Sequence, residues 1–166
     1  MVKPGSHVLV DTNVIIEAHR TGCWNALVGA YRMDTVSRCV EECETGNQRA
    51  DNPVPVNTQA LRQALNPKPV TPLEIYDLLS QCPDAADIDA GEKELLAHAL
   101  TLKDALFVIS SADRAALRVA AKLGFMDRLV SLQELCDAAG VRPKIQNHFS
   151  TKWLKDRRTE YQMETL

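Results

Sequence analysis

A strand-like run that ends in an aspartate is the feature that most constrains how this 166-residue chain can fold. Residues 8–10 (Val-Leu-Val) favour a β-strand, and the polar triplet Asp11, Thr12 and Asn13 follows directly. Residues 14–16 then begin an apolar pattern typical of a helix. Ligands of open α/β sheets bind where a strand ends and the next helix begins. Asp11 therefore has two interpretations, a helix cap or the first residue of a binding site.

The same order of strand and helix recurs along the chain. Further extended stretches are predicted at residues 35–37, 105–110 and 129–131. Predicted helices lie at residues 40–44, 58–65, 73–81, 92–102, 114–123 and 132–139, with Gly46, Gly124 and Gly140 marking three of the helix ends. Residues 47–72 are otherwise a loop rich in proline. This alternation predicts an α/β fold with a central, mainly parallel sheet and helices on both faces.

The composition indicates one globular domain, with 45% hydrophobic and 25% charged residues. A net charge of -3 argues against a protein that coats nucleic acid through bulk positive charge. The charge is uneven, because residues 142–166 contain six basic and three acidic residues, which gives +3 there and -6 elsewhere. No leader peptide and no apolar stretch of about 18 residues is visible, so we expect a cytoplasmic protein without a membrane partner.

Cysteine and histidine spacing gives no sign of a disulfide scaffold or a zinc site. The five cysteines are Cys23, Cys39, Cys43, Cys82 and Cys136, with no CxxC pair among them. The four histidines form no i, i+4 ligand pair. No local context activates a thiol as a nucleophile, so we predict reduced thiols that pack as small hydrophobic groups.

Acidic residues recur near the predicted ends of four elements. These residues are Asp11, Glu42, Glu92 and Asp113. Clustered carboxylates repel one another, so such a group persists only where protons or cations neutralise it. Carboxylate oxygens suit Mg²⁺ or Mn²⁺, and both ions assist phosphodiester hydrolysis. The sequence therefore predicts a magnesium or manganese site.

The acidic residues lie in four segments that resemble the motifs of PIN-domain proteins, in particular the VapC-type ribonuclease toxins. The segments are VLVDTNVII, VEECETG, GEKELLAHAL and VISSADRAALRVAAKLGF, within residues 8–125. The resemblance implies a three-layer α/β/α sandwich over residues 1–141, followed by a helical basic extension over residues 142–166. It also implies a metal-dependent endoribonuclease with RNA as its substrate. An antitoxin partner and a homodimer stay open.

The resemblance assigns roles to individual residues. Its metal ligands and catalytic residues are Asp11, Glu42, Glu92 and Asp113, supported by Thr12, Asn13 and Ser111. Glu41 is an alternative to Glu42, because a helix turns by about 100° per residue and only one of the two can face the site. Glu94 is the alternative to Glu92. Asp89 and Glu92 also have the spacing of a capping box, in which both would be satisfied locally.

The basic extension has two interpretations. As an RNA-binding surface it would use Lys152, Lys155, Arg157 and Arg158. Phe149, Trp153 and Tyr161 lie among these residues and could stack on bases. Alternatively, Trp153 and Leu154 dock a terminal helix on the body or on a partner.

Other functional classes fit the motifs less well. A phosphatase of the haloacid-dehalogenase type needs a second aspartate two residues after the first, but position 13 is Asn. A receiver domain needs an acidic pair at the first strand and a late lysine, and neither pattern is convincing. The remaining alternative is a catalytically inactive PIN-like module that binds RNA or protein, with the acidic residues acting as helix caps.

Overall fold

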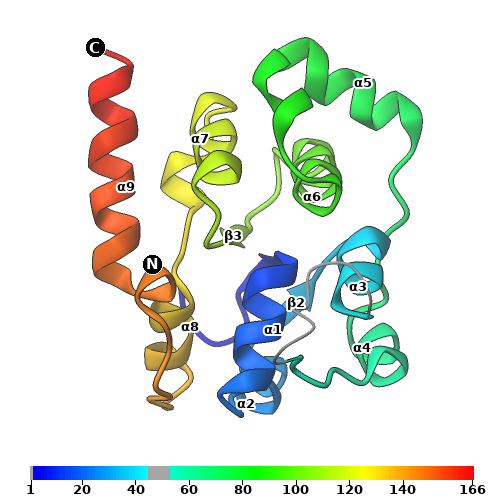
Figure 1. Cartoon of the computed structure of the whole chain (residues 1–166), viewed down its shortest axis with the longest axis vertical. Helices are drawn as coiled ribbons and strands as arrows, with labels where there is room; N and C mark the ends of the chain where they lie inside the picture. Colours follow the sequence, from blue (N-terminus) through cyan, green and yellow to red (C-terminus); the bar gives the residue numbers. More distant parts are fainter. Residues whose placement is uncertain (1, 45–52) are drawn as a thin grey trace.

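A small parallel sheet forms the centre of the computed structural model, which describes residues 2–44 and 53–166. Within these ranges the sheet has three strands, β1 (His7–Val10), β2 (Arg32–Asp34) and β3 (Val108–Ser110), in the order β2-β1-β3. Both strand pairs are parallel, and β1 is central (Figure 1). The predicted α/β class with a parallel sheet is therefore confirmed.

Helices account for most of the remaining structure. They are α1 (Thr12–Arg20), α2 (Trp24–Ala30), α3 (Ser37–Glu44), α4 (Thr58–Leu65), α5 (Pro72–Gln81), α6 (Ala90–Thr101), α7 (Arg114–Lys122), α8 (Leu132–Ala138) and α9 (Thr151–Glu164). Short 3₁₀ turns lie at Pro83–Asp87, Met126–Arg128 and Asn147–Phe149. No helix in the described part of the chain is both long and apolar enough to cross a membrane.

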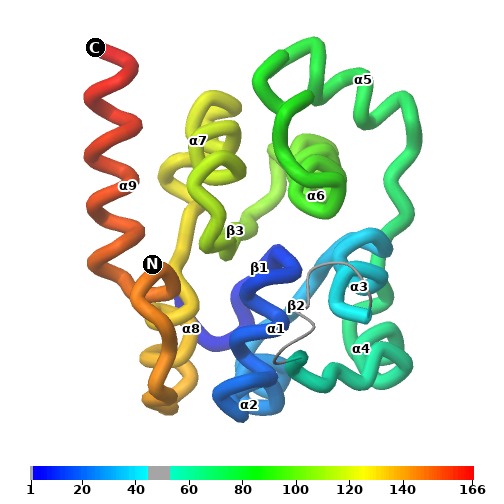
Figure 2. Tube along the Cα trace, viewed as in Figure 1, coloured from blue at the N-terminus to red at the C-terminus, as the bar shows by residue number. Residues whose placement is uncertain are grey.

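The sheet separates two apolar cores. Successive side chains of a strand point to opposite faces, so Val8 and Val10 enter one core and Leu9 enters the other. The first core is shared with α1, α2 and α8, and the second with α5, α6 and α7. Figure 2 shows these two groups of helices on opposite sides of β1. The carboxyl end of β1 is thereby held between two packed layers.

The second strand differs from the sequence prediction, which placed an extended stretch at residues 35–37. β2 is Arg32–Asp34, and Ser37 already begins α3. Helix α2, just before β2, was also not predicted. The strand is inconspicuous in the sequence because one of its buried positions is Asp34, which is stabilised by hydrogen bonds to His7 Nε2 (3.1 Å) and His98 Nε2 (3.2 Å).

The later strands are shorter than predicted. β3 covers residues 108–110 of the predicted 105–110, and Leu106 is 94% exposed. Arg128 donates to the carbonyl oxygens of Lys103 (2.6 Å) and Ala105 (2.7 Å), which holds this segment in a turn. The predicted strand at residues 129–131 is reduced to one parallel bridge between Leu129 and Ile109. Its last residue instead caps α8 through a capping box.

Glycine was predicted to end three helices, and the structure describes two of these positions. Gly124 and Gly140 follow α7 and α8 with φ values of +88° and +80°, the left-handed conformation that glycine adopts readily. Gly46, predicted to end the second helix, lies outside the described residues.

Helix α9 packs along α7 and α8 at one edge of the molecule (Figure 1). Leu154 and Tyr161 are buried in the second core, and Trp153 packs against it. The Tyr161 hydroxyl donates to the carbonyl oxygen of Arg114 (2.8 Å), and Arg158 donates to that of Leu129. The basic extension therefore contributes to the packing of the body.

We expect Tyr161→Phe to lower the free energy of unfolding by about 1 kcal/mol, because it removes one buried hydrogen bond but keeps the ring. Urea denaturation of the full chain measures this change. Tyr76→Phe is the matched control, because the Tyr76 side chain is 67% exposed. Equal losses in the two variants would contradict the docking of α9 through Tyr161.

Candidate functional site

Asp11 lies between the end of β1 and the start of α1, and the residue is only 1% exposed. Its Oδ1 accepts a hydrogen bond from the Thr12 backbone N–H (2.7 Å), which is the capping role. Its Oδ2 accepts from the Ser111 hydroxyl (2.9 Å), a contact between residues 100 positions apart. Asp11 is thus a helix cap and also part of a long-range polar cluster.

The pairing of β1 with β3 brings the segment after β3 to the same sheet edge. Asp11 N donates to Ser110 O (3.1 Å), which continues the strand pairing beyond β1. Ser111 Oγ, which donates to Asp11, also accepts from the Asp113 N–H (3.3 Å). The Asp113 carboxylate accepts from Ala116 N (2.9 Å) and caps α7. Ser111 therefore links Asp11 to Asp113.

Glu42 reaches the cluster from α3. Its Oε2 accepts from the Thr12 hydroxyl and its Oε1 from the Gly91 N–H, both at 3.0 Å. The Glu42 side chain is 12% exposed, whereas that of Glu41 is 57% exposed. Of the two neighbouring glutamates, Glu42 is therefore the one that faces the cluster. Asn13, predicted as a supporting residue, is half-buried in the first turn of α1.

Gly91 permits this approach of Glu42, a role that the sequence analysis missed. A Cβ at position 91 would collide with the Glu42 carboxylate. Glycine costs about 1 kcal/mol relative to alanine inside a helix. A glycine in the first turn of α6, directly before an acidic residue, was the available signal of a close contact.

Glu92 is buried on the first turn of α6, with 6% of the residue exposed. Burial raises its pKa to about 9, and the negative charges of Asp11, Asp113 and Asp89 act in the same direction. The Asp89 side chain makes no capping hydrogen bond, so the predicted capping box is incomplete. Glu94, the alternative to Glu92, is half-buried and interacts with charged residues of α3.

The acidic residues affect one another electrostatically. Burial raises the pKa of Asp11 to about 6, although the hydrogen bonds from Ser111 and Thr12 oppose this shift. The charges of Asp113 and Glu42 raise it further. Asp11 and Glu92 are therefore costly to ionise beside the other acidic residues, as expected for a group that requires protons or a cation.

A cavity of about 10 Å³ lies between Asp11 and Glu92, close to the smallest volume that holds one water molecule. Ser111 also lines it, and the rest of its wall is apolar. This low-polarity surrounding explains why burial is the largest contribution to both raised pKa values.

The chemistry of these donors fits a hard divalent cation, because they are carboxylate oxygens with mutually repelling charges. As the side chains are arranged, no group of three His, Cys, Asp or Glu residues in the described ranges could hold a metal ion. Glu42, Asp11 and Asp113 instead accept hydrogen bonds from protein donors. The ligand set Asp11, Glu42, Glu92 and Asp113 stays a prediction.

Cys39 and Arg38 are two residues near the cluster that the sequence analysis did not identify. Cys39 Sγ lies 3.9 Å from Asp11 Oδ1 and 3.5 Å from Gly91 O, and burial raises its pKa well above the usual value. Arg38 Nε is 3.9 Å from Glu42 Oε1, and its side chain is 50% exposed. Their spacing of three and four residues before Glu42 was the available signal, since such residues share a helix face.

The predicted RNA-binding residues of α9 divide into two kinds. Arg157 pairs with Glu160 (3.1 Å) and lies over the Trp153 ring, whereas Arg158 binds a backbone carbonyl of the body. Lys152 and Lys155 are exposed. Arg158 therefore serves the docking of α9, whereas Arg157 binds residues of the same helix. The two lysines are the better placed to meet a phosphate, although Lys152 pairs with Asp156 (2.9 Å).

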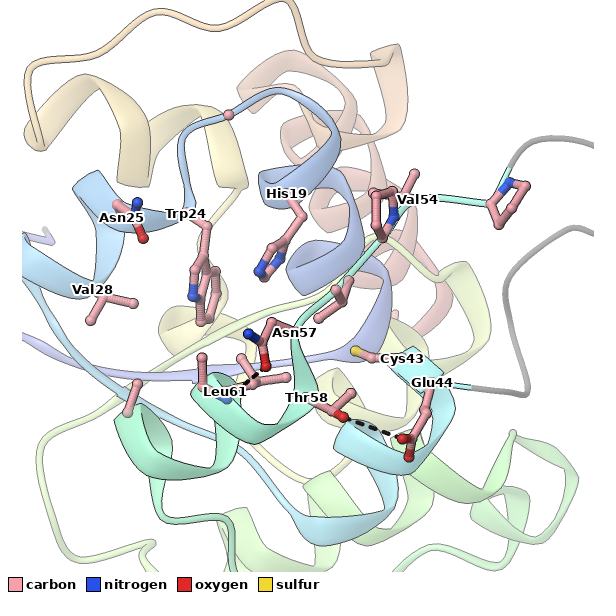
Figure 3. Close-up of a pocket in the computed structure, with 16 residues that line it drawn as sticks. His19, Trp24, Asn25, Val28, Cys43, Glu44, Val54, Asn57, Thr58 and Leu61 are labelled. Carbon is pink, nitrogen blue, oxygen red and sulfur yellow. Dashed lines mark hydrogen bonds between the residues drawn. The ribbon is translucent and has the colours of Figure 1, made fainter.

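A separate groove of about 930 Å³ lies beside α1, α2 and α4 (Figure 3). The rings of His19 and Trp24 are stacked there, with centroids 5.0 Å apart. Cys43 and Glu44 line the groove from the end of α3, but none of the four predicted metal ligands does. The groove is thus distinct from the acidic cluster.

Comparison with known proteins assigns no function to the acidic cluster. No protein-family model matches this chain, and no curated protein matches it.

Proposed function

We propose that this protein is a metal-dependent endoribonuclease of the PIN type that hydrolyses RNA phosphodiester bonds. The observation that carries the proposal is the hydrogen-bonded network in which Thr12 joins Glu42 to the cluster and Ser111 joins Asp11 to Asp113. This network lies at the carboxyl edge of a parallel sheet, where α/β enzymes bind their ligands. The four sequence motifs supply its acidic residues.

The proposed ligands of Mg²⁺ or Mn²⁺ are Asp11, Asp113, Glu92 and Glu42. The bound ion would supply an acidified water molecule and stabilisation of the negative charge that develops on the phosphate. Ser111 and Thr12 orient the carboxylates through their hydroxyl groups. Without a cation, Glu92 retains a proton at neutral pH, because its pKa is about 9.

Phosphate contacts are proposed for three exposed cations. Arg38 lies beside Glu42 at the margin of the cluster, and Lys152 and Lys155 lie on the exposed face of α9. Arginine and lysine bind phosphate oxygens of RNA without reading the base. Pairing with an antitoxin protein, as in the VapC-type toxins that the motifs resemble, and a homodimer are further parts of this proposal.

Manganese binding tests the site without relying on catalysis. We expect Mn²⁺ binding to release protons at pH 7.5, since Glu92 must lose its proton to become a ligand. The binding heat measured by calorimetry should therefore differ between Tris and PIPES buffers, because the ionisation enthalpies of these buffers differ. Affinity should increase as the pH rises toward 9, the pKa of Glu92.

Two variants provide the comparison for this titration. Asp11→Asn should lose Mn²⁺ binding, whereas Asp77→Asn, at an exposed position of α5, should bind like the wild type. Equal heats in the two buffers would contradict the ligand role of Glu92.

The alternative function is an inactive PIN-like module that binds RNA or protein. The capping bonds of Asp11 and Asp113 favour it, because they give both residues a structural role. Retention of Mn²⁺ binding by Asp11→Asn, or its absence from the wild type, would support this alternative over the nuclease.

A further inference from the structure

Two buried thiols, Cys23 and Cys136, meet outside the acidic cluster. Cys23 directly precedes α2 and Cys136 lies in α8, so 113 positions separate them in the sequence. Their Sγ atoms are 3.7 Å apart, with the Cys136 thiol donating toward Cys23. A disulfide requires about 2.05 Å, so the sulfurs would approach by less than about 2 Å. Cys23 lies in the short connection between α1 and α2, outside both helices.

The two thiols have unequal environments. The Cys136 thiol donates toward Cys23 Sγ and stabilises negative charge on it, and the Thr21 hydroxyl, which donates to the Glu17 carbonyl oxygen (2.9 Å), lies 3.4 Å from Cys23 Sγ. The contact with Cys136, above all, lowers the pKa of Cys23 below its usual value, although burial opposes the shift. The pKa of Cys136 is raised, because its proton is shared with Cys23 and because it is buried. Cys23 is thus the thiol of the pair that ionises more readily, and Cys136 provides the neighbouring thiol that can resolve an oxidised Cys23.

A cavity gives small molecules a route to this pair. It has a volume of about 270 Å³ and is lined by Cys136 together with Asp137, Arg142 and other residues of α8 and the following segment. Cys136 lines this cavity and its Sγ is 3.7 Å from Cys23 Sγ, so a peroxide molecule in the cavity lies one side chain away from Cys23.

We propose that Cys23 and Cys136 are a peroxide-sensitive pair that forms an intramolecular disulfide between the α1–α2 connection and α8. The thiolate of Cys23 attacks one oxygen of hydrogen peroxide, and the O–O bond breaks. With one proton taken up, this gives Cys23 sulfenic acid and one water. Cys136 then attacks the Cys23 sulfur, and its thiol proton leaves with the hydroxyl group as a second water. Two thiols are oxidised to one disulfide and one peroxide is reduced to two waters.

Cys39 and Cys43 lack this combination. Cys39 is directed toward Asp11 and a backbone carbonyl, and burial keeps its pKa well above the usual value. Burial raises the pKa of Cys43 to about 12, so its thiol remains protonated at neutral pH. We therefore expect oxidation to select Cys23 and Cys136.

The test is mild oxidation of the reduced full-length chain by hydrogen peroxide under native conditions. Maleimide labelling after denaturation should count three reactive thiols instead of five. The intact monomer should be lighter by two hydrogens, and a non-reduced digest should contain one peptide pair joining Cys23 to Cys136. This mapping uses the wild-type chain, so it does not depend on the folding of a variant.

Variants then separate the two roles. Cys136→Ser should stop at the Cys23 sulfenic acid, which dimedone traps, and Cys82→Ser should still form the disulfide. Retention of all five reactive thiols by the wild type would overturn the proposal. So would a digest that joins other cysteines, or addition of oxygen without a crosslink.

Discussion

Asp11→Asn should reduce Mn²⁺-dependent RNA cleavage by at least about 100-fold. Loss of an outer-shell partner of a metal site already costs about 10- to 100-fold in activity, and loss of a direct ligand should cost more. Asparagine is uncharged and cannot neutralise the bound ion. Its carbonyl oxygen can still accept from the Thr12 N–H, and its amide can donate to the Ser111 hydroxyl oxygen. The fold should therefore persist. Initial rates on labelled single-stranded RNA measure cleavage, and thermal melting followed by circular dichroism checks the fold.

The matched control for this variant is Asp77→Asn, the same substitution at an exposed position of α5. It should cleave RNA at the wild-type rate. EDTA should stop cleavage by both the wild type and the control, which distinguishes this activity from a metal-independent contaminant. Cleavage by Asp11→Asn within a few-fold of the wild type would exclude the proposed role of Asp11.

Glu92→Gln should have opposite effects on activity and stability. We expect RNA cleavage to fall strongly, while the metal-free protein gains up to about 4 kcal/mol of unfolding free energy at pH 7.5, because each pH unit above the unfolded pKa costs about 1.4 kcal/mol. The folded-state pKa of Glu92 is about 9, above its unfolded value of 4.5. At pH 7.5 the folded protein therefore keeps a proton that the unfolded chain has released. Folding must protonate Glu92, and glutamine removes this cost.

The sign of the effect fixes its pH window. The destabilisation of the wild type by Glu92 should increase as the pH rises from 4.5 toward 9. It should vanish below 4.5, where Glu92 is protonated in both the folded and the unfolded protein. Urea denaturation in EDTA at several pH values measures the difference between variant and wild type. Glu41→Gln, at a side chain 57% exposed, should change stability by less than about 0.5 kcal/mol. A gain in Glu92→Gln that is independent of pH would contradict the explanation.

Local patterns in the sequence were sufficient to predict the part of the candidate site around Asp11. The apolar run before Asp11 and the helix after it depend on neighbouring residues, so their order predicted the strand, the junction and α1 correctly. β2 could not be found in this way. Its buried Asp34 interrupts the apolar pattern, and the two histidines that stabilise it come from β1 and α6.

The basic extension illustrates a different limit of sequence reasoning. Composition alone suggested four equivalent RNA contacts, but a charged side chain can also bind its own protein. Arg158 donates to the Leu129 carbonyl, and Arg157 lies between Glu160 and Trp153. Lys152 and Lys155 face solvent instead. The position of each residue on the helix decides between these roles, once the buried face of α9 is known.

The sequence by itself determined the alternation of strands and helices, the parallel α/β class and the presence of acidic residues near the ends of elements. These properties follow from periodicity and residue type over short distances. Only the tertiary structure decided that Ser111 bonds to Asp11, that Glu42 lies against Gly91 and that Glu92 is buried enough to raise its pKa. Such contacts depend on how β1 pairs with β3 and on how α3 packs against α6. They join residues that are 49 and 100 positions apart, so no local pattern specifies them.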